Sequence, residues 1–275
     1  MAEAGHLDGH LEAALVEAGR PVDRWCRMSR GDRPGGAWPE PGLRAGAALR
    51  LPKARASIEL AVHAIGAHLP PGSPLWVYGA NDEGIRSAGK RLGPLFDAVK
   101  TLDTRRKCRI WQAKRTDAPA RSPLSAWQTT TRLAVPDTDI ELDWTELPGV
   151  FAAGRFDEAS VALLQAMTPL RPDARILDFG CGAGFLSAMI SRRYPGAQMH
   201  LLDADAVALE AARENVPDGV FFLGDGWRPA PDLRVLDQQA IRRRARRRNA
   251  LLFLFVAVIV GFFAVAFVHA ALVAG

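Results

Sequence analysis

The sequence predicts an α/β fold made of two Rossmann-like units in tandem, the first degenerate and the second incomplete, followed by one C-terminal transmembrane helix. Three observations lead to this prediction. The order helix, turn, strand, loop and helix occurs twice along the chain. The second loop is rich in glycine and follows an apolar strand, which is typical of a ligand-binding loop. Residues 250–275 contain no Asp, Glu, Lys or Arg.

The 275-residue chain has an ordinary globular composition, with 48% hydrophobic and 24% charged residues. Its net charge of +5 depends on six arginines within residues 242–248, so the rest of the chain is nearly neutral and its charge gives no argument for RNA binding. Cys26, Cys108 and Cys181 show no disulfide or metal spacing, which indicates a reducing, cytosolic environment and no metal site. The polar start, residues 1–10, lacks the apolar core of a secretory signal.

Changes in composition divide the chain into five predicted segments. The first fifty residues are rich in Gly, Pro, Ala and Arg, so they are expected to be loosely ordered apart from a short helix at residues 11–18. The segments are a loosely ordered N-terminal part (1–50), a degenerate N-terminal domain (51–145), the ligand-binding front half of a second domain (146–235), a basic juxtamembrane segment (236–249) and a transmembrane helix (250–275).

The two copies of the repeated pattern differ in their loops. The first copy has a helix over 57–69, a buried strand over 75–78, a loop over 79–84 and a helix from residue 85. The second has a helix over 159–170, a strand over 176–178, a loop over 180–184 and a helix over 185–192. Where the second copy has Asp178, Gly182 and Gly184, the first has Val77, Asn81 and Glu83. The first copy is therefore predicted to be a structural or RNA-docking domain. Alternatively, this order is common in α/β proteins and reflects no duplication.

The second loop predicts a cofactor site. Asp178 precedes a loop with glycines at Gly180, Gly182 and Gly184, which allow a tight turn and a backbone close to a ligand, and the helix that follows offers N–H groups at its start. A dinucleotide fingerprint would require glycine in place of Phe185. The carboxylate would repel phosphates but attract a cation. S-adenosylmethionine, with its sulfonium and ammonium groups, fits this pattern.

The following elements agree with this cofactor. A second strand over 199–202 ends at Asp203, which is placed to accept hydrogen bonds from ribose hydroxyls, with Asp205 as a less favoured substitute. A helix over 207–214 and a strand over 220–223 follow, and Asp225 is placed to accept a bond from the adenine amine. The alternative for each aspartate taken alone is a helix cap or a turn residue.

At this point the sequence resembles a known family. The residues that carry the resemblance are Leu147–Phe151, Asp157, Ser160 and the glycine loop, and in the first copy Leu51–Lys53, Tyr78–Asn81 and Gly84–Ala88. They resemble the "methyltransferase small" group, and within it the ribosomal RNA small subunit methyltransferase C type. The resemblance implies two tandem domains, the first degenerate, and S-adenosylmethionine as cofactor. It also implies ribosomal RNA or the small ribosomal subunit as partner, with methylation of the exocyclic N2 of a guanine.

The resemblance stops after residue 233. The family's Asn-Pro-Pro-aromatic motif, which would hold the target amine and stack on the base, occurs nowhere in the sequence. Catalytic residues therefore stay unassigned, and about half of the expected sheet is missing. Two alternatives to an active enzyme remain open. One is a membrane-anchored module that binds only cofactor or RNA. The other is a gene truncated by frameshift or fusion and joined to an unrelated membrane segment.

The C-terminal segment reads differently from the rest. At ~1.5 Å rise per residue, a helix over 250–275 exceeds the ~30 Å hydrocarbon core of a bilayer. The alternative is a buried helix of a soluble protein. The arginines at 242–248 indicate an orientation signal, with an RNA-binding arm or a nuclear signal as the other interpretations. We expect a single-pass protein with a cytoplasmic body and an external C-terminus, in contact with the lipid bilayer.

Overall fold

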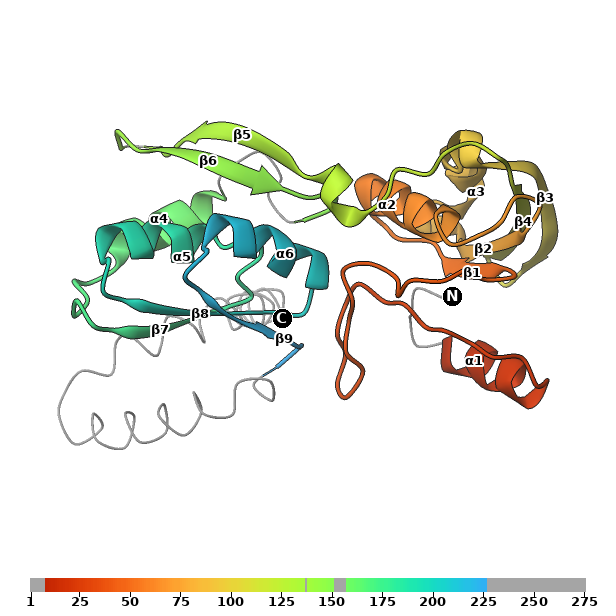
Figure 1. The fold of residues 1–275 in the computed structure, drawn as a ribbon, viewed down its shortest axis with the longest axis horizontal. Coiled ribbons are helices and arrows are strands. Elements are labelled where there is room, and N and C mark those ends of the chain that lie inside the picture. The colour runs from red at the N-terminus through yellow and green to blue at the C-terminus, as the bar shows by residue number, and fades with distance from the viewer. Residues whose placement is uncertain (1–7, 137, 151–156, 227–275) are drawn as a thin grey trace, which may run out of the picture. The chain divides into compact units, whose positions relative to one another are not determined.

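The computed structural model describes residues 8–136, 138–150 and 157–226, whose strands form three sheets (Figure 1). The N-terminal helix α1 covers Asp8–Glu17, as the sequence predicts within three residues. Four short 3-10 helices lie at Asn81–Glu83, Gly89–Arg91, Gly93–Leu95 and Leu124–Trp127.

The first sheet has the strand order β1-β2-β4-β3. Its strands are β1 (Ala47–Arg50), β2 (Pro74–Ala80), β3 (Phe96–Arg105) and β4 (Cys108–Arg115). Helix α2 (Arg55–Gly66) connects β1 to β2, which pair in parallel. Apolar residues of α2 recur every three or four positions, so one face of the helix packs on the inward side chains of the strands. This face supplies much of the first hydrophobic core.

The third sheet is parallel and has the order β7-β8-β9. Its strands are β7 (Arg175–Phe179), β8 (Gln198–Asp203) and β9 (Val220–Leu223), and its helices are α4 (Glu158–Ala166), α5 (Phe185–Arg193) and α6 (Ala206–Asn215). The three helices lie on one side of the sheet (Figure 1). The central strand β8 is the most buried, because it has a neighbour on both sides. The predicted elements of this unit are confirmed; their ends agree within one residue except at the C-terminus of α4, which ends four residues early.

The predicted duplication holds for the order of elements but not for the sheet. In both units a helix, a strand, a loop and a helix follow one another, the last being the short α3 (Ile85–Ala88) in the first unit. However, β2 pairs with β4 antiparallel, whereas β7 pairs with β8 in parallel. After α3 the first unit forms the antiparallel β3–β4 hairpin. In the second unit, α5 is followed instead by β8, which pairs in parallel with β7. The first unit, predicted as a degenerate copy, therefore departs from the second at β3 and β4, where the pairing is antiparallel.

Along the chain, a further hairpin follows the first unit and precedes the second. It consists of β5 (Thr129–Ala134) and β6 (Glu141–Glu146), which pair antiparallel. Leu142 and Trp144 of β6 pack with Ala212 and Val216 at the end of α6. The hairpin is therefore part of the core beside the third sheet, and the sequence patterns did not reveal it.

The predictions for the basic segment 236–249 and the transmembrane helix 250–275 fall outside the described residues. Among the helices that the structure does describe, none is both long and apolar enough to cross a bilayer.

Candidate cofactor site

Three aspartates lie where parallel strands reach their carboxyl ends. Asp178 is the second-last residue of β7, Asp203 is the last residue of β8, and Asp225 follows the end of β9 by two residues. Ligands of open α/β sheets bind at this edge. The structure therefore brings the three predicted acids to one edge of the sheet.

The glycine loop contains two kinds of glycine. Gly180, Gly182 and Gly184 have φ of 75°, 56° and 86°, in the left-handed region that favours glycine. A Cβ at Gly180 or Gly182 would meet no heavy atom within 4 Å, so both backbones face open space. A Cβ at Gly184 would lie 3.0 Å from Cγ2 of Val216 and 3.3 Å from Cδ2 of Leu201. Gly184 is thus required for packing, whereas Gly180 and Gly182 leave room for a ligand.

The N–H groups of residues 180–182 in this loop donate hydrogen bonds within the protein. The carbonyl of Leu202 accepts from the N–H groups of Gly180, at 2.7 Å, and Cys181, at 3.1 Å. The N–H of Gly182 donates to Oδ2 of Asp203 at 2.8 Å. These bonds hold the loop against the end of β8. The glycines therefore provide space for a ligand, and the donors at residues 180–182 fix the loop.

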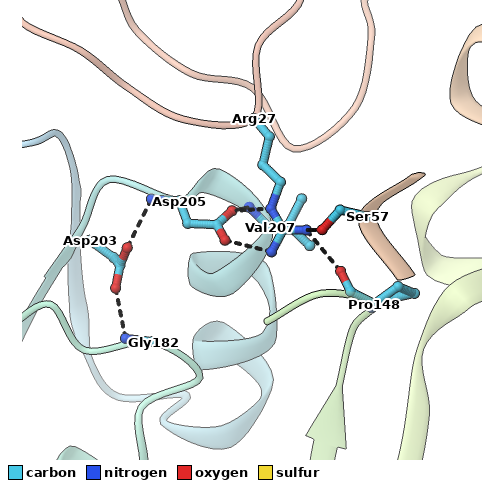
Figure 2. A network of polar contacts seen from close by, with 7 residues as sticks. All are labelled: Arg27, Ser57, Pro148, Gly182, Asp203, Asp205 and Val207. Carbon is cyan, nitrogen blue, oxygen red and sulfur yellow. Dashed lines mark hydrogen bonds and ion pairs between the residues drawn. The ribbon is translucent and has the colours of Figure 1, made fainter. Parts of the chain in front are cut away.

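Asp203 is held at both carboxylate oxygens (Figure 2). Besides the bond from Gly182, its Oδ1 accepts from the N–H of Asp205 at 2.8 Å. Each carboxylate oxygen can accept more than one hydrogen bond, so the ribose hydroxyls of a ligand still find acceptors here. Asp203 is thus a fixed acceptor at the end of the central strand.

Asp178 is half-buried and lies in β7, two residues before Gly180. Its Oδ2 accepts a 2.7 Å hydrogen bond from Oγ of Ser187, in the first turns of α5. Burial raises the pKa of Asp178, and the nearby charge of Asp203 acts in the same direction, while the bonds from Ser187 oppose the shift. A cation beside Asp178 would remove much of the cost of ionising it in this environment.

The same surroundings affect Cys181. Burial, followed by the charges of Asp178 and Asp203, raises the pKa of its thiol far above the usual value. A thiol with a raised pKa is a poor nucleophile at neutral pH. Cys181 is therefore a small buried side chain of the loop, consistent with its absence from the predicted site residues.

Asp225 and Asp205 have partners that are distant in sequence. Asp225 is exposed, and its Oδ2 accepts from the N–H of Gly31 at 2.9 Å. Asp205 caps α6 by accepting from the N–H of Val207 at 3.0 Å, and it also forms an ion pair with Arg27. The helix-cap alternative considered for the aspartates thus describes Asp205, which leaves Asp203 as the acceptor facing the loop.

Asn215, at the end of α6, supports the loop and was missed by sequence reasoning. Its Nδ2 donates to the carbonyls of Ala183 and Thr145, each at 3.0 Å, and its Oδ1 accepts from the N–H of Thr145 at 2.8 Å. One amide side chain therefore connects α6, the glycine loop and β6. A single asparagine at the end of a helix gives no sequence signal for such a role.

Two motifs that carried the family resemblance have structural roles here. Asp157 caps α4 by accepting from the N–H and the hydroxyl of Ser160. Gly149 has φ of 75°, and a Cβ there would lie 2.2 Å from Oγ of Ser57. The segment around Gly149 therefore needs glycine to pass close to α2.

The donor set fits S-adenosylmethionine. Asp178 would hold a cation and Asp203 would accept from ribose hydroxyls, while no heavy atom lies within 4 Å of a Cβ built at Gly180 or Gly182. Among the described residues, no group of three His, Cys, Asp or Glu side chains could hold a metal ion.

Comparisons with known proteins find a family match for each of the two units. Residues 37–131 match the family described as Methyltransferase small domain N-terminal, and residues 141–221 match Methyltransferase small domain. Ribosomal RNA small subunit methyltransferase C of Stutzerimonas stutzeri is 39% identical over 200 residues, which are 71% of this chain and 59% of that protein. The protein of the same name from Pseudomonas aeruginosa is 39% identical over 202 residues, covering 72% and 58%. The chain thus spans less than two thirds of the length of these relatives.

A solved structure agrees with this at the level of the fold. It is the T. thermophilus 16S rRNA N2 methyltransferase in complex with AdoMet and guanosine, with a TM-score of 0.58 and 22% sequence identity. The match covers 78% of this chain and 55% of that one. Residues 37–131 and 141–221 are therefore similar to the two domains described for the methyltransferase small family, and the solved structure has a similar fold.

Proposed function

We propose that the chain supplies the cofactor-binding part of an S-adenosylmethionine-dependent methyltransferase that acts on the exocyclic N2 of a guanine in small-subunit ribosomal RNA. The observation that carries the proposal is the hydrogen bond from the N–H of Gly182 to Asp203. It holds the carboxylate of Asp203 beside a glycine loop with open space at Gly180 and Gly182. The curated relatives named above support the rRNA substrate. Ribosomal RNA is proposed as the substrate of the whole protein on the basis of this similarity.

Each site residue has a proposed role. Asp178 attracts the cationic methionine end of the cofactor, and Asp203 accepts bonds from the ribose hydroxyls. Gly180 and Gly182 let the cofactor approach the backbone, and Gly184 keeps the loop close to α6. Asp225 accepts from the adenine amine. The cofactor supplies an activated methyl group when it is bound.

Cofactor binding tests the proposal. Calorimetry with S-adenosylmethionine should show binding to the wild-type chain and none to Asp178→Ala. Asp173→Ala is a matched control, because Asp173 is an exposed acid just before β7 that pairs with Arg171 at the surface. Equal affinity of the Asp178→Ala variant and the wild type would contradict the assignment.

Methyl transfer needs a separate test. The Asn-Pro-Pro-aromatic motif, which the resemblance implies for holding the target amine, is absent from the sequence. Positioning supplies much of the rate of such a reaction. We therefore expect the chain by itself to bind the cofactor without detectable methylation of 30S particles. Incorporation of labelled methyl groups that depends on Asp178 would contradict this expectation and reveal a different group that holds the amine.

From the sequence alone, we also propose that residues 250–275 cross a bilayer, with the body of the protein on the cytoplasmic side. The segment has no Asp, Glu, Lys or Arg, and six arginines precede it within residues 242–248, which favours this orientation. Membrane fractionation tests the proposal. The chain should resist extraction by high salt and dissolve in detergent; release by salt alone would mean that the arginines hold it at the surface.

A further inference from the structure

A strap near the N-terminus, residues 25–36, lies against the end of β8. The carbonyl of Ala204 accepts from the N–H of Ser29 at 2.7 Å, and the carbonyl of Arg27 accepts from the N–H of Ala206 at 3.0 Å. Met28 and Asp205 form an antiparallel bridge. The strap therefore forms backbone hydrogen bonds with residues 204–206, which directly follow β8. The sequence, in contrast, predicts that residues 1–50 are loosely ordered.

The strap is itself held in one conformation. The carbonyl of Cys26 accepts from the N–H of Gly36 at 2.8 Å, and Nε1 of Trp25 donates to the carbonyl of Gly36 at 2.8 Å. Oγ of Ser29 accepts from the N–H of Gly35 at 2.8 Å. The two ends of the strap are thus joined to each other by these hydrogen bonds, which fix the conformation of its backbone.

Arg27 connects the strap to the site. Its guanidinium is 7% exposed and donates twice to the carboxylate of Asp205, at 2.6 Å to Oδ1 and 2.5 Å to Oδ2 (Figure 2). Its third nitrogen, Nη1, donates to the carbonyl of Pro148 at 2.8 Å and to Oγ of Ser57 at 3.4 Å. Two-point arginine–carboxylate pairs fix orientation as well as charge. Arg27 therefore connects Asp205 to Ser57 of α2 and to Pro148.

Asp205 in turn contacts Asp203, the proposed acceptor for the ribose hydroxyls. Its N–H donates to Oδ1 of Asp203, whose other oxygen accepts from the N–H of Gly182. The contacts run without interruption from Arg27 through Asp205 and Asp203 to the glycine loop (Figure 2). The strap also reaches the end of β9, where the N–H of Gly31 donates to Asp225.

We infer that Arg27 is a positioning residue for the cofactor site, and that the strap forms the wall at the adenosine end. The inference rests on the proposed function. Two acids expected to contact the adenosine, Asp203 and Asp225, are held by the strap, Asp203 through Asp205 and Asp225 directly through Gly31. A ligand that includes adenosine should therefore be sensitive to Arg27 without touching it.

Two variants test this inference. Arg27→Met removes the guanidinium, and the double variant Arg27→Met with Asp205→Asn removes both charges, so that no unpaired charge stays buried. Asparagine also keeps the cap of α6, since it is as good an N-cap as aspartate. Arg27→Lys restores the charge with a single point of contact. Arg50→Met is the matched control, because Arg50 makes a 2.7 Å ion pair with Glu83 inside the first unit.

The measurement is calorimetric affinity of the full chain for S-adenosylmethionine and S-adenosylhomocysteine, well below the lowest melting temperature of the set. We expect both ligands to bind about tenfold more weakly to Arg27→Met and to the double variant, as is typical when a supporting residue is lost. Arg27→Lys should lie in between, and Arg50→Met should match the wild type. The melting temperature, measured in parallel, reports any purely structural effect.

The outcomes separate the two proposals. If the double variant melts at a lower temperature but binds both ligands like the wild type, Arg27 only joins the units, and the inference is overturned while the proposed function stands. An affinity loss of the same size in Arg50→Met would also overturn it. If the wild-type chain binds neither ligand, the proposed function itself fails. Should Arg27→Met not fold, the double variant and Arg27→Lys provide the comparison.

Discussion

Gly182 and Gly184 stand two residues apart in the same loop, yet replacing them by alanine should affect different properties of the protein. At Gly184 the added methyl group would lie 3.0 Å from Cγ2 of Val216 and 3.3 Å from Cδ2 of Leu201. At Gly182 it would meet no heavy atom within 4 Å. The first substitution should therefore damage the fold, and the second should damage the binding of a ligand that comes close to the loop.

The magnitudes follow from these surroundings. Left-handed backbone costs a residue with a Cβ about 1–2 kcal/mol, and this applies to both positions. Overpacking a core adds about 1–3 kcal/mol, and this applies only to Gly184. The free energy of unfolding should thus fall by about 2–5 kcal/mol in Gly184→Ala and by about 1–2 kcal/mol in Gly182→Ala. Affinity for S-adenosylmethionine should fall at least about tenfold in Gly182→Ala, which corresponds to about 1.4 kcal/mol.

Urea unfolding followed by tryptophan fluorescence measures the first quantity, since Trp144 is buried beside α6, and calorimetry measures the second. Gly72→Ala is a control for left-handed backbone alone, because Gly72 has φ of 85°, no neighbour within 4 Å and a position in the first unit. It should cost as much stability as Gly182→Ala and leave affinity unchanged. The reasoning would be refuted if Gly182→Ala lost more stability than Gly184→Ala while binding the cofactor normally.

Three further predictions concern charge, thiols and support of the loop. Because burial raises the pKa of Asp178, affinity for the cationic cofactor should fall as the pH is lowered through that raised pKa, with proton uptake by the free protein. Because the pKa of Asp178 is higher in the folded than in the unfolded protein, its protonated carboxyl group favours folding at low pH, and this stability is lost as the pH rises. Asp178→Asn should therefore be at least as stable as the wild type at neutral pH without ligand. A lower melting temperature of the variant would contradict this. In a thiol titration of the native chain, exposed Cys108 should react quickly, and the buried Cys26 and Cys181 only after unfolding; rapid labelling of Cys181 would contradict its raised pKa. Asn215→Ala leaves three backbone groups without their partner and should lower the free energy of unfolding by about 2–3 kcal/mol in urea; a loss below about 1 kcal/mol would mean that water replaces the amide.

The elements of the second unit could be predicted because their signals are local. An apolar run before a glycine loop marks β7, and an aspartate before an apolar run marks the start of α6 at Asp205. The repeated order also identified α2 and β2 in the first unit. Each of these signals is complete within about a dozen residues, so no knowledge of distant contacts is needed.

The two hairpins could not be predicted, because their signals are weak. The β3–β4 turn places Arg106 and Lys107 at φ of 46° and 67°, a conformation that Asn-Gly usually marks in a sequence. Most side chains of β3 are exposed, so it shows no alternation of apolar and polar residues. In the same way, the ion pair of Arg27 with Asp205 joins residues 178 positions apart, and no pattern of spacing relates them.

The loop of the first unit shows how the same position can be closed to a ligand. Glu83, which stands where the second unit has Gly184, bends back so that its Oε2 accepts from the N–H of Ala80 at 3.1 Å and its Oε1 from Arg50 at 2.7 Å. The N–H of Asn81 donates to the carbonyl of Lys107 in the β3–β4 turn at 2.7 Å. In the second unit the acceptor for the loop is instead Asp203, from the neighbouring parallel strand, and the loop's own side chains are small. The loop of the first unit is thus held by its own glutamate and by one backbone bond to the β3–β4 turn. A loop held from the side by an aspartate keeps its glycines open, which is why the pattern of acids and glycines, more than the order of elements, indicates where a ligand binds.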